Sequence, residues 1–420
     1  MLRFPSNFLF GTATSAHQIE GDNIYNDWWH YEQEGKLPYK SGKACNHWNL
    51  YSQDIELMAS LGYGAYRFSI EWARIFPEEG KKDEKALERY NDILKLLNAR
   101  KIIPLVTLHH FTLPYWFLEK GGFEKEENLR YWEEYVETVR DEIRGVNLIA
   151  TFNEPVVYML SSYVLGDWPP FKKSPKAASD VEANILRAHA KAYEILSNKF
   201  KVGIVKNIPL FLAASDKPKD LKATSRADHL FNFNFMDALW SGNLKALMGK
   251  YRTPEGDTDF IGVNYYSPYT VRHSLNPLQF FIDYDVADIG ERRTDMGWSV
   301  YPEGIYKAVE KMYRYNRPIY ITENGIATLD DEWRIEFIVQ HLQYVHKAIK
   351  DGYTVHGYFH WSFMDNFEWD KGFAPRFGLV EIDYKNFERK PKKSAHVYGE
   401  ISKNREISEK ILKRYGVMIE

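Results

Sequence analysis

Eight short apolar stretches recur along the chain, and segments with helical periodicity lie between them. The stretches are rich in β-branched and aromatic residues, which favour strands, and the intervening segments repeat apolar residues three to four positions apart. The expected strands are residues 8–14, 64–70, 102–108, 147–152, 201–207, 259–266, 318–323 and 355–361, and the clearest helical segments are 51–61, 87–100, 131–143 and 335–351. Eight strands is the number that closes a (β/α) barrel.

Length alone leaves the organisation open, because 420 residues could hold two or three ordinary domains or one barrel. The chain has no linker rich in Pro, Gly or Ser, no low-complexity tract, and no tandem copy of a longer unit. These features favour a single α/β domain over residues 1–420. We expect a (β/α)8 or TIM barrel with its active site at the carboxyl ends of the strands.

The charge and the distribution of apolar residues indicate which binding partners and which cellular compartment to expect. The formal net charge is −3, and basic residues are interspersed with acidic ones, which argues against nucleic-acid binding. The longest apolar run, residues 156–165, falls short of the roughly 20 residues of a spanning helix, and Pro5 and Asn7 interrupt any signal-peptide core. A single cysteine, Cys45, suits a reducing compartment. We therefore expect a soluble, cytoplasmic protein.

Polar and aromatic side chains follow the expected strands, at the point where each strand ends. They are His17, Gln18, Arg67, His109, His110, Asn153, Glu154, Asn207, Asn264, Tyr266, Glu323, Asn324, Trp361 and Glu368. In a parallel barrel the carboxyl ends of all strands face one rim, so these residues should surround one pocket. Aromatic residues make up 16% of the chain, and rings with a polar handle suit a sugar site, although a large aromatic core explains most of them.

Two of these residues are carboxylic acids, each next to an asparagine: Glu154 in "FNEP" and Glu323 in "TENG". Facing each other across a barrel mouth, such a pair suits double displacement on a glycoside, in which one group attacks the sugar and the other protonates the leaving oxygen. This requires surroundings that push the two pKa values apart. Arg67 and Tyr266 could keep Glu323 ionised, whereas apolar surroundings near Trp168 would favour a neutral Glu154.

Each carboxyl also has a simpler interpretation. A Glu before a Pro commonly starts a helix, because Pro suits the first turn and acidic groups favour its dipole. Because Glu154 and Glu323 both stand at the ends of expected barrel strands, a catalytic role is favoured for the pair. A metal site near His109 and His110, or His356 and His360, is disfavoured, since neighbours in a strand point to opposite faces and no zinc spacing occurs. We expect no metal and no cofactor.

Six ordered strings carry a resemblance to a known family: "FLFGTATSAHQIEG", "YRFSIEWARIFP", "TFNEP", "DFIGVNYYSP", "IYITENG" and "YFHWSFMDNFEW". Together they closely resemble the family 1 glycoside hydrolases, which are retaining β-glycosidases on a (β/α) barrel. The match spans about Phe4 to Tyr398.

The resemblance implies a role for each matching residue. It makes Glu154 the general acid/base and Glu323 the nucleophile, with Arg67 and Tyr266 orienting the nucleophile. Asn153 would contact the sugar 2-hydroxyl. The remaining substrate-binding positions implied are Gln18, His110, Glu368 and Trp369 as hydroxyl ligands, Trp361 as the stacking floor, and Asn264 and Phe377 as pocket lining.

The chain departs from the family pattern at two positions. Phe111 stands where the family usually has a tryptophan, so one donor to the sugar should be missing and discrimination at the 3-hydroxyl relaxed. His17 replaces the usual tyrosine, and we attach no function to it. The branch that cleaves 6-phospho-sugars carries serine, lysine and tyrosine where this chain has Glu368, Pro375 and Phe377. A carboxylate would repel a phosphate, which implies a non-phosphorylated glycone.

Three other features suggest properties outside the pocket. Residues 273–291, with Leu275, Leu278, Phe280, Phe281 and Ile282, would form a rim loop that packs on the barrel or makes an apolar entrance for alkyl or aryl aglycones or a peripheral surface contact. The basic segment from Arg389 to Ser394 is expected to be a solvated turn. Abundant Lys and Glu with scarce Gln predict heat stability.

The leading hypothesis is a retaining, exo-acting β-glycosidase that cleaves terminal glucosides, galactosides or mannosides. Two alternatives stay open at this point. A sugar-binding barrel without catalysis would have lost one carboxyl, and a metal-dependent sugar isomerase would also place Glu, His and Asn at a barrel rim. The sequence leaves the preferred sugar, the aglycone and a possible homo-oligomer undecided.

Overall fold

A closed parallel barrel organises the computed structural model, which describes residues 1–276, 282–290 and 292–419. All eight expected strands form, and they close in the order β10-β13-β14-β2-β3-β4-β5-β6. Their bounds are β2 Leu9–Ala13, β3 Ala65–Ser69, β4 Ile103–His109, β5 Leu148–Asn153, β6 Lys201–Asn207, β10 Phe260–Asn264, β13 Ile319–Asn324 and β14 Val355–Trp361. The (β/α)8 prediction is confirmed.

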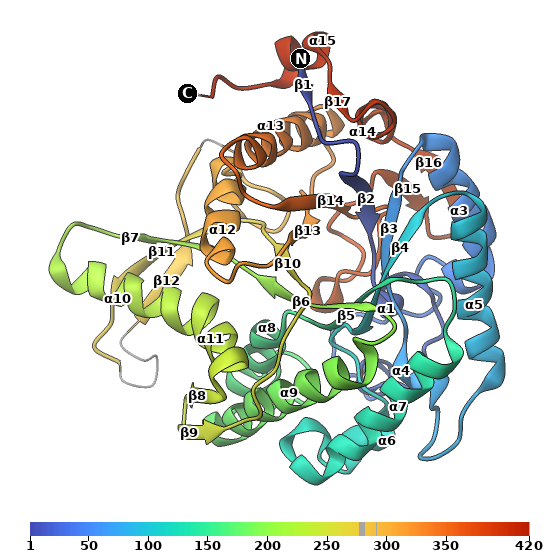
Figure 1. Ribbon diagram of the computed structural model, residues 1–420, viewed down its shortest axis with the longest axis vertical. Helices are drawn as coiled ribbons and strands as arrows, with labels where there is room; N and C mark the ends of the chain where they lie inside the picture. The colour runs from blue at the N-terminus through green and yellow to red at the C-terminus, as the bar shows by residue number, and fades with distance from the viewer. Residues whose placement is uncertain (277–281, 291, 420) are drawn as a thin grey trace.

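Amphipathic helices surround the barrel, and Figure 1 shows α3 and α5 on one side, α7 and α9 on the next, and α13 and α14 on the opposite side. The four segments expected as helices match α3, α5, α7 and α13, and the last three of them run one residue past the helix end. The bounds are α3 His47–Leu61, α5 Glu84–Ala99, α7 Leu129–Glu142, α9 Pro175–Leu196, α12 Glu303–Tyr313, α13 Asp331–Lys350, α14 Lys393–Asn404 and α15 Glu409–Tyr415. Shorter helices are α1 Ala16–Ile19, α2 Asp27–Gln33, α4 Trp72–Ile75, α6 Tyr115–Glu119, α8 Pro155–Met159 and α11 Asn234–Ser241.

Side chains fill the inside of the barrel, so it is a core and not a channel. One buried cluster draws residues from all eight strands, which only the barrel interior can bring together: Ala13, Ala65, Leu105, Leu148, Ala150, Val205, Phe260, Tyr320, Phe359 and Trp361. A second, larger cluster packs the outer faces of the strands against the helices. The filled interior leaves the rim at the carboxyl ends as the place for a site.

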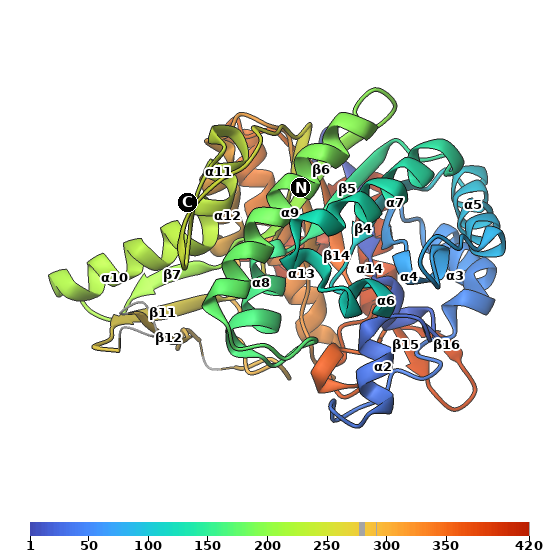
Figure 2. The ribbon, with the colours of Figure 1, turned by 90° about the horizontal axis from the view of Figure 1, so that it is seen from below.

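A small sheet and one helix project from the barrel in both views (Figures 1 and 2). Strands β7 Leu210–Ala213, β11 Pro268–His273 and β12 Ile282–Val286 form the sheet, and α10 Pro218–Asp228 packs on it. The rim loop expected at 273–291 is therefore wrong in part, because β11 and β12 pair antiparallel. Ile282 packs near Val271, Leu275 is 84% exposed, and Leu278, Phe280 and Phe281 lie outside the described residues.

The basic segment from Arg389 to Ser394 is not a solvated turn, so that prediction is wrong. It forms the end of β16 Glu388–Pro391, which pairs with β15 Val380–Asp383, and the start of α14. Arg389 is buried and donates to Asp54 at 2.7 and 2.9 Å. Arg389 and Lys392 have buried carboxylate partners, Asp54 and Asp365, which local sequence cannot show. The remaining strands are β1 Leu2–Arg3 with β17 Glu406–Ile407, and β8 Asn243–Ala246 with β9 Gly249–Arg252.

No helix in the described part of the chain is both long and apolar enough to cross a membrane.

Candidate active site

The strands that carry the two carboxyl groups both end irregularly. Between Ala150 and Asn153 on β5, and between Ile321 and Asn324 on β13, the register with the neighbouring strand shifts. In a regular strand the side chains of adjacent residues point to opposite faces. A bulge changes the direction of the side chains that follow it. Both carboxyl-bearing turns thereby face the rim.

Glu323 is held by two donors that favour its ionised form. Arg67 Nη1 lies 2.6 Å from Glu323 Oε1, and the Tyr266 hydroxyl donates to Oε2 at 2.7 Å. Arg67 itself is fully buried and points inward from β3, where its Nε donates to Thr107. Burial and the charge of Glu323 raise the pKa of Tyr266 well above its usual range, so the phenol stays a donor. These contacts are the ones expected from the sequence.

Glu154 sits in surroundings that favour its neutral form. Burial raises the pKa of Glu154 to about 8, and the nearby charge of Glu323 adds to the rise. Its Oε1 accepts a hydrogen bond from Asn264 Nδ2 at 2.7 Å. The residue has φ +45°, a left-handed conformation that is costly for glutamate and is typical of functional sites. It also stands at the N-cap of α8, whose first residue is Pro155, so it starts a helix as one interpretation of the sequence expected, although its side chain makes no capping hydrogen bond.

A chain of hydrogen bonds joins the two carboxyl groups. Arg67 Nη2 donates to Asn153 Oδ1 at 2.7 Å, and Asn264 Nδ2 donates to the same oxygen at 3.2 Å as well as to Glu154. Asn153 Oδ1 is therefore an acceptor, which leaves its Nδ2 to donate to His110 Nε2 at 3.2 Å. His110 then carries its proton on Nδ1, and burial and Arg67 lower its pKa, keeping it neutral.

A second polar pair lies on the far side of the pocket. Gln18 Nε2 donates to Glu368 Oε2 at 3.2 Å, across 350 positions of sequence. Burial raises the pKa of Glu368 to about 8, with the charge of Glu323 as the next cause. The raised pKa of Glu368 therefore reflects burial and the proximity of Glu323.

Aromatic rings line the space between these groups. The His110 ring lies parallel to Trp361 at 5.9 Å and to Trp369 at 6.3 Å between centroids. Phe111 packs against Trp168 at 4.9 Å and Trp369 at 5.4 Å. Phe377, at 2% exposure, lies 6.3 Å from the Tyr266 ring. All the predicted substrate-binding residues therefore come together at one rim.

Some polar residues at strand ends turn away from the pocket. His109 packs among Phe123, Phe152 and Tyr158 behind the strands, as alternation predicts. Asn324 donates to the carbonyl of Tyr265 at 2.7 Å and accepts from Tyr358, so it joins neighbouring strands. Among the residues that the structure describes, no three His, Cys, Asp or Glu side chains gather where a metal ion could bind.

Sequence reasoning overlooked two supports of the site. His17 lies parallel to Trp369 at 5.7 Å between ring centroids and contacts Glu32 at 3.0 Å, so it supports the pocket wall. Thr322 donates to Asn264 Oδ1 at 2.7 Å, which fixes the amide of Asn264 so that its N–H groups face Glu154 and Asn153. His17 stands out in the sequence as a departure from the family pattern, but its supporting contacts do not, and Thr322 has no sequence signal of its own, because both act through contacts made across the barrel.

Glycine is required directly after the Glu323 turn. A Cβ at Gly325 would collide with the carbonyl oxygen of Trp361. The close approach of β13 and β14 at this point explains the glycine in "TENG". It brings the Glu323 turn against the backbone of Trp361.

Two carboxyl groups lie in a single hydrogen-bond network at a barrel rim, one beside a cation and a phenol and the other with a raised pKa, and this arrangement suits acetal cleavage. The molecule is a glycoside hydrolase built on a (β/α)8 barrel.

Comparison with known proteins specifies the family. The glycosyl hydrolase family 1 pattern matches residues 1–407, and the chain belongs to that family. β-Glucosidase A of Thermotoga maritima is 35% identical over 444 residues, which cover 96% of this chain and 98% of that protein. A β-glycosidase from Pyrococcus horikoshii is 64% identical, with TM-score 0.98 and 99% coverage of both chains. β-Glycosidase activity is thereby established as the general function.

Relatives of two substrate classes are similarly distant. A 6-phospho-β-galactosidase of Staphylococcus haemolyticus is 32% identical over 468 residues, covering 97% of this chain and all of that protein. The structure of the Thermotoga maritima β-glucosidase in complex with glucoimidazole is 34% identical, with TM-score 0.89 and 96% and 100% coverage. Overall sequence similarity therefore does not distinguish between β-glucosidases and 6-phospho-β-galactosidases. The distinction has to come from the residues of the site.

Proposed function

We propose that the protein is a retaining, exo-acting β-glycosidase that cleaves terminal, non-phosphorylated β-D-glycosides by double displacement. The observation that carries the proposal is the contrast between the two carboxyl groups. Glu323 has a cation and a phenol as partners, whereas Glu154 is buried with a raised pKa. A nucleophile needs partners that stabilise its charge, and an acid needs surroundings that favour its protonated form.

In the first step Glu323 attacks the anomeric carbon while Glu154 gives its proton to the departing oxygen. A covalent glycosyl-enzyme forms and the alcohol leaves. Esterification removes the negative charge of Glu323, which had helped to raise the pKa of Glu154. Glu154, now ionised, takes a proton from a water molecule as the water oxygen attacks the anomeric carbon, which breaks the bond to Glu323 and releases the sugar with its original β-configuration.

Polar groups around the pair are placed to hold the sugar. Within the described part of the chain, His110 Nδ1 is buried and has no hydrogen-bond partner. Since this nitrogen carries the proton, it can donate to a sugar hydroxyl. Asn153 lies next to Glu154 and fits the family's contact with the 2-hydroxyl. Gln18 and Glu368 would bind hydroxyls on the other side of the ring.

Glu368 argues against a phosphorylated sugar. Its carboxyl lies in a half-buried position beside Gln18, and Pro375 and Phe377 supply no cation for a phosphate. We expect 4-nitrophenyl β-glucoside, β-galactoside or β-mannoside to be hydrolysed with kcat/KM at least about 100-fold above the 6-phosphoglucoside, since an unpaired charge in a buried site costs several kcal/mol. Equal rates for the two would contradict the assignment.

The rate should fall at high pH. Glu154 must carry a proton in the first step, and its pKa is raised to about 8, so kcat/KM is expected to decline tenfold per pH unit above that value. A pH profile for an alkyl glucoside measures this. Glu368 has a similarly raised pKa, so Glu368→Gln provides the control. The decline should persist in that variant, and its disappearance would assign the titration to Glu368 instead.

Phe111 is expected to weaken discrimination at the 3-hydroxyl. Phe111→Trp would supply the indole donor, and one hydrogen bond contributes about 0.5 to 1.5 kcal/mol. The ratio of kcat/KM for a glucoside over its 3-deoxy analogue should rise about 2- to 10-fold. Phe111→Leu, which adds no donor, should leave the ratio unchanged. Equal ratios in Phe111→Trp and Phe111→Leu would show that this position does not contact the hydroxyl.

The remaining expectations stay proposals. We infer a single catalytic domain, a cytoplasmic location, heat stability, and an apolar entrance near the projecting sheet that admits alkyl or aryl aglycones. The exposed Leu275 and the partly exposed Tyr284 are the described residues that support such an entrance, at 84% and 55% exposure. Numerous surface ion pairs, such as Lys393 with Glu332 and Arg414 with the same carboxylate, support heat stability.

A further inference from the structure

The segment that follows β14 carries three of the proposed sugar contacts. We call residues 365–378 the pocket loop, since it holds Glu368, Trp369 and Phe377. Its two ends meet at a neck, where Asp365 Oδ1 accepts the Gly378 N–H at 2.8 Å and the backbone N–H of Asp365 donates to Val380 at 2.9 Å. A Cβ at Gly378 would collide with the backbone of Asp365, so the neck closes only around glycine.

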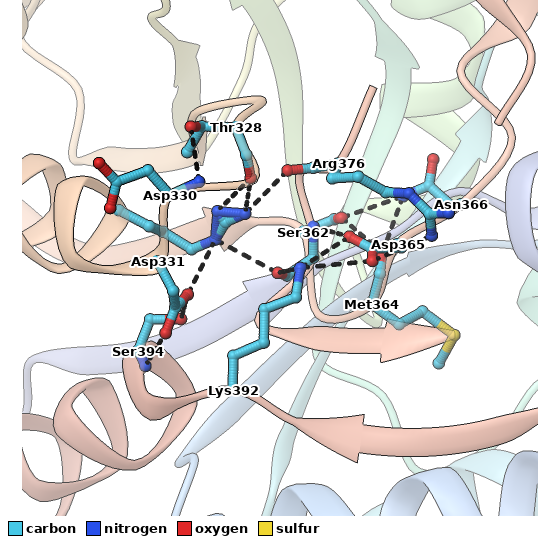
Figure 3. A network of polar contacts seen from close by, with 12 residues as sticks. Thr328, Asp330, Asp331, Ser362, Met364, Asp365, Asn366, Arg376, Lys392 and Ser394 are labelled. Atoms are coloured by element: carbon cyan, nitrogen blue, oxygen red, sulfur yellow. Dashed lines mark hydrogen bonds and ion pairs between the residues drawn. The ribbon is translucent and has the colours of Figure 1, made fainter. Parts of the chain in front are cut away.

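Cations from separate elements converge on this neck. Asp365 is fully buried, and its carboxylate accepts from Lys392 Nζ at 3.1 Å and from Arg376 Nη1 at 3.3 Å. Arg334 of α13, also fully buried, donates to the carbonyl oxygens of Arg376 at 2.9 Å and Gly378 at 3.3 Å. Figure 3 shows Lys392 reaching up to Asp365 from the entry of α14, with Arg376 on the other side. These buried charged groups all have partners, and their contacts hold the two ends of the pocket loop together.

Asn366 connects the neck to the sugar-binding pair. Its Nδ2 donates to Ser362 Oγ and to the Met364 carbonyl, both at 3.0 Å, and Figure 3 shows these residues side by side. Its Oδ1 therefore faces outward and accepts from Gln18 Nε2 at 2.9 Å. The same Gln18 nitrogen contacts Glu368 at 3.2 Å, and Ser15 donates to Gln18 Oε1 at 2.7 Å. The Gln18 amide is thus held on both sides.

We propose that Asn366, seated on the neck formed by Asp365 and Gly378, is a positioning residue for sugar binding. It fixes the Gln18 amide and, through it, orients the carboxyl of Glu368 before the sugar arrives. The inference rests on the proposed function, because it takes Gln18 and Glu368 as sugar ligands. Ligand groups held in place by a supporting contact bind more tightly, since less freedom is lost on binding.

A double-mutant cycle tests the proposal. Asn366→Ala, Gln18→Ala and the double variant are compared by kcat and KM for 4-nitrophenyl β-glucoside and by the Kd for glucoimidazole from calorimetry. Asn366→Ala is expected to weaken glucoimidazole binding about 10-fold and to raise KM more than it lowers kcat. In the Gln18→Ala background, Asn366→Ala should raise the Kd for glucoimidazole by less than about 2-fold, because Asn366 acts through Gln18. If Asn366→Ala does not fold, Asn366→Asp replaces it, since it keeps the shape and loses the donors to Ser362 and Met364.

Asn184 on α9 offers a matched control. It is buried, donates to the Phe123 carbonyl at 2.8 Å and accepts from Arg187 at 2.9 Å, outside the pocket loop. Asn184→Ala should lower the melting temperature while leaving the glucoimidazole Kd within 2-fold. If Asn366→Ala weakens glucoimidazole binding as much in the Gln18→Ala background as in the unaltered enzyme, the positioning role is overturned. The proposed function would not be affected by that result. An unchanged Kd in Gln18→Ala itself would instead remove Gln18 from the sugar site, and both proposals about it would fail.

Discussion

Replacing Glu323 with glycine is expected to lower kcat by roughly 10⁴- to 10⁶-fold, a loss of about 5 to 8 kcal/mol of transition-state stabilisation. The reason is that, in the proposed mechanism, Glu323 is the group that forms the covalent bond to the sugar. Arg67 and Tyr266 would remain, so the pocket should still bind glucoimidazole. Steady-state hydrolysis of 4-nitrophenyl β-glucoside, together with calorimetric binding, measures both quantities.

Added formate is expected to restore part of the rate in Glu323→Gly, because a small carboxylate can occupy the space beside Arg67 and Tyr266. The same addition to the unaltered enzyme should have no such effect, which provides the control. Full residual activity without formate would contradict the role of Glu323. A protein that neither binds glucoimidazole nor responds to formate would be a misfolded variant, and Glu323→Gln, which preserves the shape of the side chain, would then be used for the same measurements.

Replacing Glu154 with alanine is expected to produce a loss that depends on the leaving group. Alkyl glucosides need a proton on the departing oxygen, so their hydrolysis should slow by roughly 10²- to 10⁴-fold. A 2,4-dinitrophenyl glucoside leaves as a stable anion, and its first step should be nearly unaffected. Added azide should then replace water in the second step and give the β-glycosyl azide, because this anion needs no general base.

Glu182 on α9 is the matched control for this prediction. Burial raises the pKa of Glu182 to about 7, and the residue is 4% exposed, yet it lies outside the network that joins Glu154 to Glu323. Glu182→Gln should therefore slow alkyl and dinitrophenyl glucosides by similar factors. A uniform loss for Glu154→Ala across leaving groups would show that Glu154 is not the acid.

Much of the barrel could be predicted because each strand is a short apolar run and each is followed by a polar residue at its carboxyl end. Closure of the barrel then makes residues from opposite ends of the chain neighbours. The separation of His109 from His110 follows from alternation along the strand. The pairing of Arg67 and Tyr266 with Glu323 was expected from the chemistry of these side chains at strand ends and from the family resemblance.

The supports of the site could not be predicted, because they depend on contacts between distant segments. The register shifts that turn Asn153, Glu154 and Glu323 toward the rim interrupt the very alternation from which such positions are predicted. Lys392 is an unremarkable basic residue in sequence, yet it pairs with buried Asp365 across the fold. The projecting sheet was missed because its strands are short and are interrupted by α10.

The most direct test of the account is the configuration of the first sugar released. Hydrolysis of a β-glucoside followed by proton NMR in its first minutes, before the anomers equilibrate, reports that configuration. Double displacement through Glu323 predicts β-glucose as the first product. Initial release of α-glucose would contradict a covalent glycosyl-enzyme and the roles given to both carboxyl groups.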